Sequence, residues 1–347
     1  MTGSSFWDVS KRASILERSE RRLCNLGTYP TPVERLASPG RSGVALWVKR
    51  DDLTSDLYGG NKVRKLERLL GHARARHAHR IVTVGAAGSH HVLATAIWAR
   101  EQGMELEAVL VPQVKTAHVL ENLRADLGAG VRLLPASTYA RAALRIFGRI
   151  CAGSFYIPIG GSNLLGTLAY VDAARELAAQ VRAGDLPEPD VVVVALGSGG
   201  TAAGLAAGCA LEAMRTRVVA VTVSDPAWWI AHRVRSLAES AVSYEARRLR
   251  RRVPELRLVV DSGYLGSGYG HETEAGARAL SNGAELGLRL DGTYTAKAFA
   301  AFLDRADKGD GPNLLYWHTL SSAPMDRWLA EAPAESALEP DVQRLLL

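Results

Sequence analysis

The stretch DVVVVALGSGGTAAGLAAG, residues 190–208, decides the fold class of this chain. It opens with valines at successive positions, which is typical of a strand that is covered on both faces. A glycine-rich turn at 197–201 follows, and the small residues after it have the composition of a helix. A buried strand that passes through a tight turn into a helix indicates a parallel sheet.

The same alternation recurs outward from this stretch along the whole chain. Segments of helical periodicity, rich in Ala, Leu, Glu and Arg, include 63–75, 91–102, 166–181 and 202–215. We therefore expect an α/β protein with doubly wound parallel sheets. The expected strands are 44–48, 81–84, 106–111, 131–134, 155–159, 191–196, 218–223, 256–260 and 314–317.

The composition is that of a globular chain with ample material for a core. Of 347 residues, 47% are hydrophobic and 22% charged, which excludes disorder, collagen and coiled coil as the main structure. The net charge of +6 is mild and does not indicate a nucleic-acid partner. A basic run at 247–252 has no interleaved aromatic residues, so we interpret it as a solvated helix face before a turn. No run of apolar residues is long enough for a membrane span.

The cysteines and the N-terminus favour a cytoplasmic protein. Cys24, Cys151 and Cys209 are odd in number and form no CxxC pair, which fits a reducing compartment better than a disulfide framework or a thiolate zinc site. Residues 1–23 contain no apolar run of signal-peptide length. Their charges recur every three or four residues, which predicts a solvated helix or a loose arm.

The turn at 197–201 is a candidate phosphate site. Its glycines, Gly197, Gly199 and Gly200, allow left-handed backbone geometry without a Cβ clash. The helix start directs free N–H groups and the positive end of its dipole at one point, which suits a phosphate. Ser198 and Thr201 can add hydroxyl donors.

A nicotinamide dinucleotide is an alternative ligand for the same turn. Gly197, Gly199 and Ala202 satisfy the relaxed fingerprint GxGxxG/A, and Asp225 lies near the end of the next expected strand. This alternative, an oxidoreductase, stays open from the residues alone. No Gly-Lys-Ser/Thr closes the turn, so a kinase-type P-loop is excluded.

A second candidate segment is VKRDDLTSDLYGGNKVRKLERLL, residues 48–70. After a strand, the chain passes through two glycines and starts a helix at which Asn61, Lys62 and Lys65 converge. A lysine at such a position is commonly just solvated. If its pKa is lowered, however, it can form an imine with a carbonyl cofactor.

The third segment is TVGAAGSHHVLATA, residues 83–96, another strand, small-residue turn and helix. Ser89, His90 and His91 stand at the expected helix start, where N–H groups could receive a substrate carboxylate. Adjacent histidines point about 100° apart on a helix, so we expect no metal site there.

Taken together, the segments resemble the D-cysteine desulfhydrase / 1-aminocyclopropane-1-carboxylate deaminase family. This family belongs to the fold-type II, tryptophan synthase beta-like enzymes that use pyridoxal 5'-phosphate. The resemblance runs in order from about Tyr29 to Thr319, most of the chain. It rests on GGNKVRKLE (59–67), YIPIGGSNLLGTLAYVDAARELA (156–178), GSGGTAAGL (197–205), DSGYLGSGYGHETEAG (261–276), TYTAKAFAAFLD (293–304) and WHT (317–319).

The resemblance implies an architecture of two doubly wound parallel-sheet domains with the active site between them. The large cofactor-binding domain would comprise 1–64 plus 160–347, and a small inserted αβ domain would comprise 65–159. It also implies a small amino-acid substrate and a homodimer.

The resemblance further implies which residues hold the cofactor. Lys62, next to Asn61, sits where the family has the lysine joined to pyridoxal phosphate. Lys65 and the turn Gly197, Ser198, Gly199, Gly200 and Thr201 match phosphate-binding positions. Thr295 falls where the family places the partner of the pyridine nitrogen. Where this chain has His90, the family usually has an asparagine that contacts the cofactor's ring oxygen. His90 therefore either replaces that donor or leaves the contact empty.

The expected reaction is α,β-elimination from a small amino acid to a 2-oxo acid and ammonia. The resemblance gives catalytic roles to Lys62, as the base for the α-proton, and to Ser89, Tyr269 and Tyr294. The deaminases carry a glutamate where this chain has Thr295, and a neutral hydroxyl makes the cofactor a weaker electron sink. We therefore favour a D-cysteine desulfhydrase-like lyase over a deaminase that opens a cyclopropane.

Two departures from the family pattern leave other outcomes open. The chain reads Gly-Ser-His at 88–90, and Leu-Ser-Ser at 320–322 replaces the usual glycines. A lyase for another β-substituted amino acid and a non-catalytic binding protein on the same fold both remain alternatives.

Overall fold

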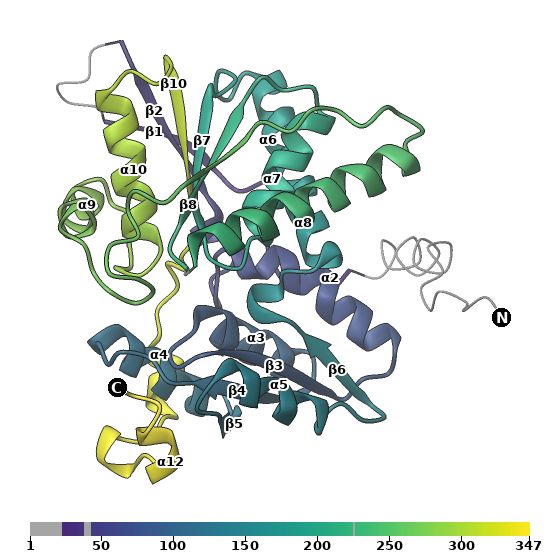
Figure 1. Ribbon diagram of the computed structural model, residues 1–347, viewed down its shortest axis with the longest axis vertical. Coiled ribbons are helices and arrows are strands. Elements are labelled where there is room, and N and C mark those ends of the chain that lie inside the picture. The colour runs from purple at the N-terminus through teal and green to yellow at the C-terminus, as the bar shows by residue number, and fades with distance from the viewer. Residues whose placement is uncertain (1–22, 38–42, 225) are drawn as a thin grey trace.

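The computed structural model describes residues 23–37, 43–224 and 226–347 (Figure 1). The arm expected at the N-terminus, apart from its last residue, and Asp225 of the dinucleotide alternative lie outside the described residues.

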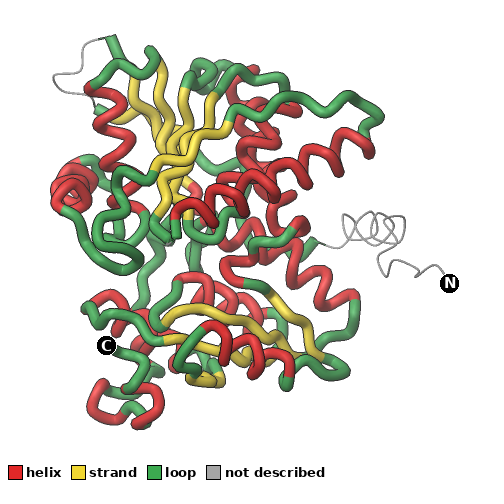
Figure 2. The backbone as a smooth tube through the Cα atoms, viewed as in Figure 1, coloured by secondary structure: helices red, strands yellow, loops and turns green. Residues whose placement is uncertain are grey.

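Two separate sheets organise the described chain, and Figure 2 shows them one above the other. The larger sheet has the order β1-β2-β10-β7-β8-β9, in which only β1 is antiparallel to its neighbour. The smaller sheet, β5-β4-β3-β6, is parallel throughout. The strands are β1 (Val33–Leu36), β2 (Ala45–Arg50), β3 (Arg80–Ala86), β4 (Glu105–Val111), β5 (Arg132–Pro135), β6 (Ser154–Ile157), β7 (Val191–Leu196), β8 (Arg217–Thr222), β9 (Leu258–Asp261) and β10 (Asn313–His318).

Helices connect the strands, as parallel pairing requires. The predicted α/β fold is confirmed, as is each predicted strand and helix, although the segment expected to be helical to 215 ends at Leu211. Strand β1 was not predicted. The helices are α2 (Asn61–Ala75), α3 (His90–Glu101), α4 (Ala117–Gly128), α5 (Tyr139–Phe147), α6 (Leu164–Ala183), α7 (Gly200–Leu211), α8 (Ala227–Arg248), α9 (Glu274–Glu285), α10 (Thr295–Asp307), α11 (Asp326–Ala330) and α12 (Pro340–Gln343), with short turns η1 (Asp51–Leu53), η2 (Ile159–Gly161) and η3 (Glu335–Ala337).

Helices cover both faces of the larger sheet, which explains the unbroken valines of β7. Val192 and Val194 pack in a core with α6, α7 and α8, whereas Val191 and Val193 pack in another core with α9 and α10. In Figure 1 these two groups of helices flank the sheet on opposite sides. Because successive side chains of a strand point to opposite faces, both sets must be apolar.

The smaller sheet is covered in the same way, and the end of the chain joins its core. On one face Ile81 packs with residues of α2, α3 and α4, and this cluster includes Met325, Trp328 and Leu345. The predicted division into 1–64 plus 160–347 and 65–159 stays a prediction. As a packing unit, however, the smaller sheet also includes C-terminal residues that this division gives to the large domain.

The basic run at 247–252 and the question of a membrane span both bear on possible partners. Only the first two residues of the basic run 247–252 lie in α8, since the helix ends at Arg248 and Leu249 caps it. The predicted solvated helix face is therefore shorter than expected, and Arg248 pairs with Glu245 at 2.8 Å. Among the described helices, none is both long and apolar enough to cross a membrane.

Candidate active site

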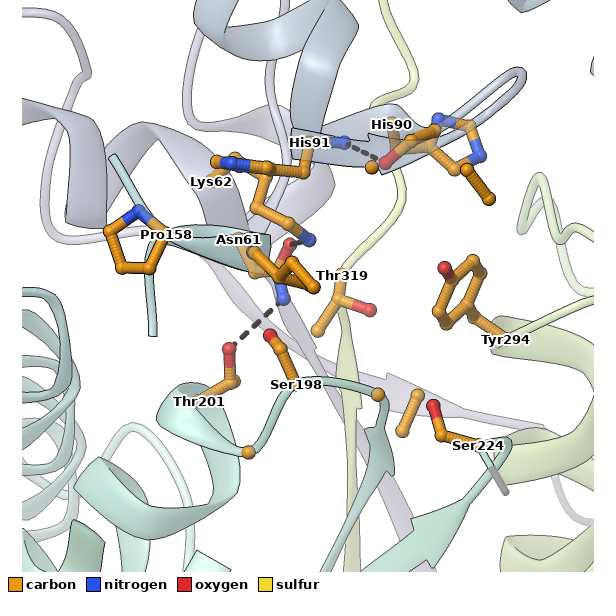
Figure 3. Close-up of a pocket in the computed structure, with 18 of the residues that line it drawn as sticks. Asn61, Lys62, His90, His91, Pro158, Ser198, Thr201, Ser224, Tyr294 and Thr319 are labelled. Atoms are coloured by element: carbon orange, nitrogen blue, oxygen red, sulfur yellow. Dashed lines mark hydrogen bonds between the residues drawn. The ribbon is translucent and has the colours of Figure 1, made fainter. Parts of the chain in front are cut away.

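A cavity of about 800 Å³ lies where the carboxyl ends of β3 and β7 face each other, so both sheets contribute to it. Ligands of open α/β sheets bind at such ends. The structure brings nearly all the predicted site residues to this cavity, and Figure 3 shows several of them. Its lining includes Asn61, Lys62, Lys65, Ser89, His90, Gly197, Ser198, Gly199, Thr201, Tyr269, Tyr294 and Thr295. Gly200, the residue of the turn at which α7 begins, does not line it.

Lys62 reaches the cavity because of the turn before α2. Gly60 has φ +88°, and a Cβ there would lie 2.7 Å from the carbonyl oxygen of Thr319. The N–H of Asn61 donates to that same carbonyl at 3.0 Å. Only glycine fits this close approach, which makes Lys62 the second residue of the helix.

The Lys62 amine is held within the cavity and is easily deprotonated. Its Nζ donates to Asn61 Oδ1 at 2.7 Å, and Asn61 Nδ2 donates to Thr201 Oγ1 at 3.0 Å (Figure 3). Burial lowers the pKa of Lys62 to about 8, against a smaller opposing effect of Asp291. Roughly a tenth of the amine is therefore neutral at pH 7, far more than for an ordinary lysine, and a nucleophilic or basic amine requires this neutral form.

A buried ion-pair network fixes the helix that carries Lys62. Arg64 donates to Asp51 at 2.8 Å and to Glu176 of α6 at 2.9 Å. Asp51 also accepts from the Tyr170 hydroxyl and from the indole N–H of Trp317, both at 2.7 Å. This part of the RKLE motif therefore anchors α2 and does not enter the cavity.

The turn 197–201 forms the opposite wall. Gly199 has φ +99°, so the turn uses the left-handed geometry expected of glycine. Ser198 and Thr201 line the cavity at the N-terminus of α7, a place suited to an anion. The loop at Gly160 approaches so closely that a Cβ there would lie 2.0 Å from Ser198 Oγ.

Lys65 supports this wall from behind. Its Nζ donates to Gly160 O at 3.1 Å and to Ser162 Oγ at 3.3 Å. Burial, together with the positive charges of Lys62 and Arg233, lowers the pKa of Lys65 well below its ordinary value. An anion bound at the turn would offset that penalty and restore the charge.

Two residues of this wall were not predicted. Ser162 accepts a hydrogen bond from the N–H of Gly200 at 3.0 Å and bonds to Ser198 Oγ at 2.8 Å. Arg233 of α8 donates to the carbonyls of Ser198 and Ser162, both at 3.1 Å. Ser162 could have been found from GGSN in the family motif. Arg233 carries no local signal, because it is one arginine among several in a helical segment.

The residues at the start of α3 have different surroundings. Ser89 caps the helix by accepting from the N–H of His91 at 3.3 Å. The His91 ring lies 2.9 Å from Thr83 Oγ1, and burial lowers its pKa well below the ordinary value. His90 has contacts through both ring nitrogens, to Tyr58 and His118, so neither nitrogen is free to face a ligand.

The two predicted tyrosines meet in the cavity. The hydroxyls of Tyr269 and Tyr294 are hydrogen-bonded to each other, and the rings are edge-to-face. Burial raises the pKa of both hydroxyls. They are therefore protonated at neutral pH and can donate hydrogen bonds.

Thr295 has a carboxylate beside it that sequence reasoning missed. Its hydroxyl donates to Asp291 Oδ2 at 2.6 Å, and Asp291 also accepts from the N–H groups of Thr293 and Tyr294. Burial opposes ionisation of Asp291, but His90 and these hydrogen bonds prevail and lower its pKa. The signal for it was an Asp-Gly pair before a helix, a common capping pattern.

Within the described residues, no group of three or more His, Cys, Asp or Glu side chains is arranged to hold a metal ion.

Comparisons with known proteins identify relatives along most of the chain. The family model described as "Pyridoxal-phosphate dependent enzyme" matches residues 25–319. A putative 1-aminocyclopropane-1-carboxylate deaminase of Pyrococcus furiosus is 34% identical over 89% of this chain and 94% of its own length. A D-cysteine desulfhydrase of Klebsiella pneumoniae is 36% identical over 84% of this chain and 91% of its own. A crystal structure of an ACC deaminase homologue superposes with a TM-score of 0.76 at 31% identity, covering 92% of this chain and 98% of that one. The dinucleotide interpretation finds no support among these relatives.

Proposed function

The chain belongs to the pyridoxal-phosphate-dependent enzyme family, and on that premise we propose that it is a lyase which eliminates a leaving group from the β-carbon of a small amino acid. The observation that carries the proposal is the Lys62 amine, with a pKa of about 8, in one cavity with the turn 197–201. D-Cysteine is the favoured substrate.

The donor set of the cavity fits the cofactor. An aldehyde needs a primary amine that is partly neutral, and Lys62 supplies it. A phosphate needs N–H and hydroxyl donors with positive charge nearby. The start of α7, with Ser198, Thr201 and Lys65, supplies these. When bound, pyridoxal phosphate withdraws electrons from the α-carbon of the amino acid joined to it.

The chain's own groups then have separable tasks. Lys62, held by Asn61 Oδ1, takes the α-proton as a neutral amine. The N–H groups at the start of α3, capped by Ser89, bind the substrate carboxylate. Tyr269 and Tyr294, protonated and hydrogen-bonded to each other, donate a proton or hydrogen bond to the departing group.

Thr295 supports elimination of sulfide over opening of a cyclopropane. A neutral hydroxyl keeps the cofactor a weaker electron sink than a glutamate would, and β-elimination of a good leaving group depends less on that sink. Besides the relatives named as 1-aminocyclopropane-1-carboxylate deaminases, Asp291 favours the second candidate function, that of such a deaminase. Its carboxylate accepts the Thr295 proton at 2.6 Å, and the hydroxyl oxygen accepts from the N–H of Asp291 at 2.6 Å, which leaves one lone pair of that oxygen for a further hydrogen bond.

A substrate screen tests both candidates. D- and L-cysteine, β-chloroalanine, serine, diaminopropionate and 1-aminocyclopropane-1-carboxylate are assayed for ammonia release with the wild type, Lys62→Ala and Lys308→Ala. Lys308 is an exposed lysine after α10 and serves as the control. We expect pyruvate, sulfide and ammonia from D-cysteine, lost only in Lys62→Ala. Release from the cyclopropane substrate alone supports the second candidate, and release from none supports a binding protein.

The enzyme acts as a cytoplasmic homodimer in this proposal. The dimer follows from the family resemblance. The reducing compartment is supported by the cysteines, of which Cys24 and Cys209 are buried and all three are unpaired. Sedimentation of the purified protein at micromolar concentration tests the dimer, and a monomer would contradict it.

A further inference from the structure

Three aromatic side chains connect the cavity to the molecular surface. Tyr58 and His90 line the cavity, whereas His118, near the start of α4, has a side chain that is 33% exposed. The Tyr58 hydroxyl lies 3.0 Å from His90 Nδ1, and His90 Nε2 lies 2.7 Å from His118 Nε2. Every step of this path is within hydrogen-bond distance.

Asn122 settles which ring nitrogens carry protons. Its Nδ2 donates to the carbonyl of Gly88 at 2.9 Å, which fixes the NH₂ group on this side. The same NH₂ faces His90 Nδ1 at 3.4 Å and His118 Nε2 at 3.3 Å. One NH₂ hydrogen goes to Gly88, and the other needs an acceptor in His90 Nδ1 or His118 Nε2. In either case a neutral His90 carries its proton on Nε2 and donates it to His118, because the two rings share the contact between their Nε2 atoms. The Tyr58 hydroxyl then donates to His90 Nδ1.

The hydrogen bonds thus point in one direction, from the cavity outward. His118 carries its own proton on Nδ1, which faces Glu121 at 3.9 Å and solvent. We propose that Tyr58, His90 and His118 form a proton relay between the cavity and solvent.

The relay conserves protons in each passage. Tyr58 gives its hydroxyl proton to His90 Nδ1 as it takes one from the cavity. His90 passes its Nε2 proton to His118 Nε2, and His118 releases its Nδ1 proton to water. Every hydrogen bond is then reversed, and the return passage carries one proton inward. No oxidant, reductant or further reactant is needed.

The surroundings keep each member in the form that the relay needs. Burial, then His118, Lys62 and Arg289, lower the pKa of His90 to about 3, with Asp291 opposing. His90 therefore passes protons as a neutral ring and does not store them. Burial, with a contribution from Asp126, raises the pKa of Tyr58, so its hydroxyl is protonated at rest.

The relay rests on the proposed lyase function, in which it exchanges protons between the cavity and solvent separately from Lys62: an outward passage removes one proton from the cavity, and the next passage returns one. Elimination transfers the α-proton to Lys62, and the leaving group needs a proton of its own. The relay also distinguishes this chain from relatives that have asparagine at position 90, because an amide cannot exchange protons in this way.

The test compares His118→Ala, His90→Asn and a control, His232→Ala, an exposed histidine on α8. We expect kcat of the holoenzyme to fall by about ten- to a hundredfold in the first two and to stay unchanged in the control. Free imidazoles should restore the rate of His118→Ala, because that site is open to solvent. The restored rate should depend on the pKa of the added imidazole.

A second measurement does not depend on turnover. Nitrogen-15 spectra of the histidine-labelled holoenzyme without substrate should show neutral His90 protonated on Nε2 at pH 6 to 8. The relay would be overturned by a His90 protonated on Nδ1, or by a His118→Ala enzyme that loses activity without any rescue by imidazoles. Unchanged kcat in His118→Ala would also overturn it. If the wild type binds no cofactor, the proposed function fails, and the same spectra of the cofactor-free protein still test the hydrogen-bond path.

Discussion

At the residue scale, the site depends on two lysines three positions apart with different surroundings. Both are at the start of α2, yet Lys62 donates to the Asn61 side chain, whereas Lys65 donates to Gly160 O and Ser162 Oγ behind the turn. One helical turn therefore separates the reactive amine from the charge that supports the phosphate site.

The lowered pKa of Lys62 predicts a gain in stability when its charge is removed. The unfolded chain keeps this proton up to about its ordinary pKa of 10.5, whereas the folded, cofactor-free chain loses it near pH 8. Its free energy of unfolding should therefore rise with pH between these values. Lys62→Met should raise the unfolding free energy of the cofactor-free protein at pH 7 by about 2 kcal/mol, after allowance for partial exposure.

Urea unfolding of the cofactor-free proteins at pH 7 and pH 10.5 measures this effect. The gain should largely disappear at the higher pH, where Lys62 is neutral in the folded state and about half neutral in the unfolded state. Lys308→Met, at an exposed lysine, should show no gain at either pH. A loss of stability in Lys62→Met at pH 7 would contradict the lowered pKa.

At the scale of elements, a helix start and a buried network hold the two walls of the cavity in place. The turn before α7 relies on Gly199 at φ +99°, and α2 relies on Arg64 between Asp51 and Glu176. The two devices are different in kind, one being backbone geometry and the other buried charge.

Gly199→Ala should weaken cofactor binding out of proportion to its cost in stability. A Cβ there meets nothing closer than 3.4 Å, so the strain is that of the positive φ alone, roughly 1–2 kcal/mol. Gly184→Ala, at φ +85° after α6 with open space around it, is a matched control for that strain. Titration with pyridoxal phosphate should show weaker binding only for Gly199→Ala. Equal affinities would mean that this turn does not bind the phosphate.

Arg64→Met should destabilise the protein by about 3–5 kcal/mol, because it leaves the Asp51 and Glu176 carboxylates buried without their partner. An exposed pair provides the contrast: Arg344→Met, which removes the bond to Asp341, should cost less than about 1 kcal/mol. Urea unfolding of both variants gives the comparison. Similar costs would show that the network does not anchor α2.

At the scale of the whole molecule, the cavity is shared by the two sheets, so a ligand there bridges both. The larger sheet contributes the end of β7 and the turn after it, and the smaller sheet contributes the end of β3. Ligand binding should therefore stabilise the molecule as one unit.

Loading with pyridoxal phosphate should raise the melting temperature of the cofactor-free protein by roughly 5 °C at concentrations far above the dissociation constant. Pyridoxal, which lacks the phosphate, should give a smaller shift. Scanning calorimetry measures both. Equal shifts for the two compounds would argue against an anion site at residues 197–201.

The sequence was sufficient for features that are local. Short apolar runs predicted every described strand except β1, whose two central residues are polar and exposed, so that it forms no apolar run. The lysine turn and the glycine turn were recognised because glycines and polar residues lie next to each other in the chain. The features that were missed are long-range. Arg233 and Asp291 reach the cavity from distant helices and loops, and nothing local indicates that Trp328 packs under the smaller sheet.

The most direct test of the central claim is to find which lysine carries the cofactor. The purified holoenzyme is reduced with borohydride, digested and analysed by peptide mass spectrometry. The account predicts a phosphopyridoxyl group on the peptide that contains Lys62, with the modified residue assigned by fragmentation. Attachment to Lys65 or to any other lysine would contradict it.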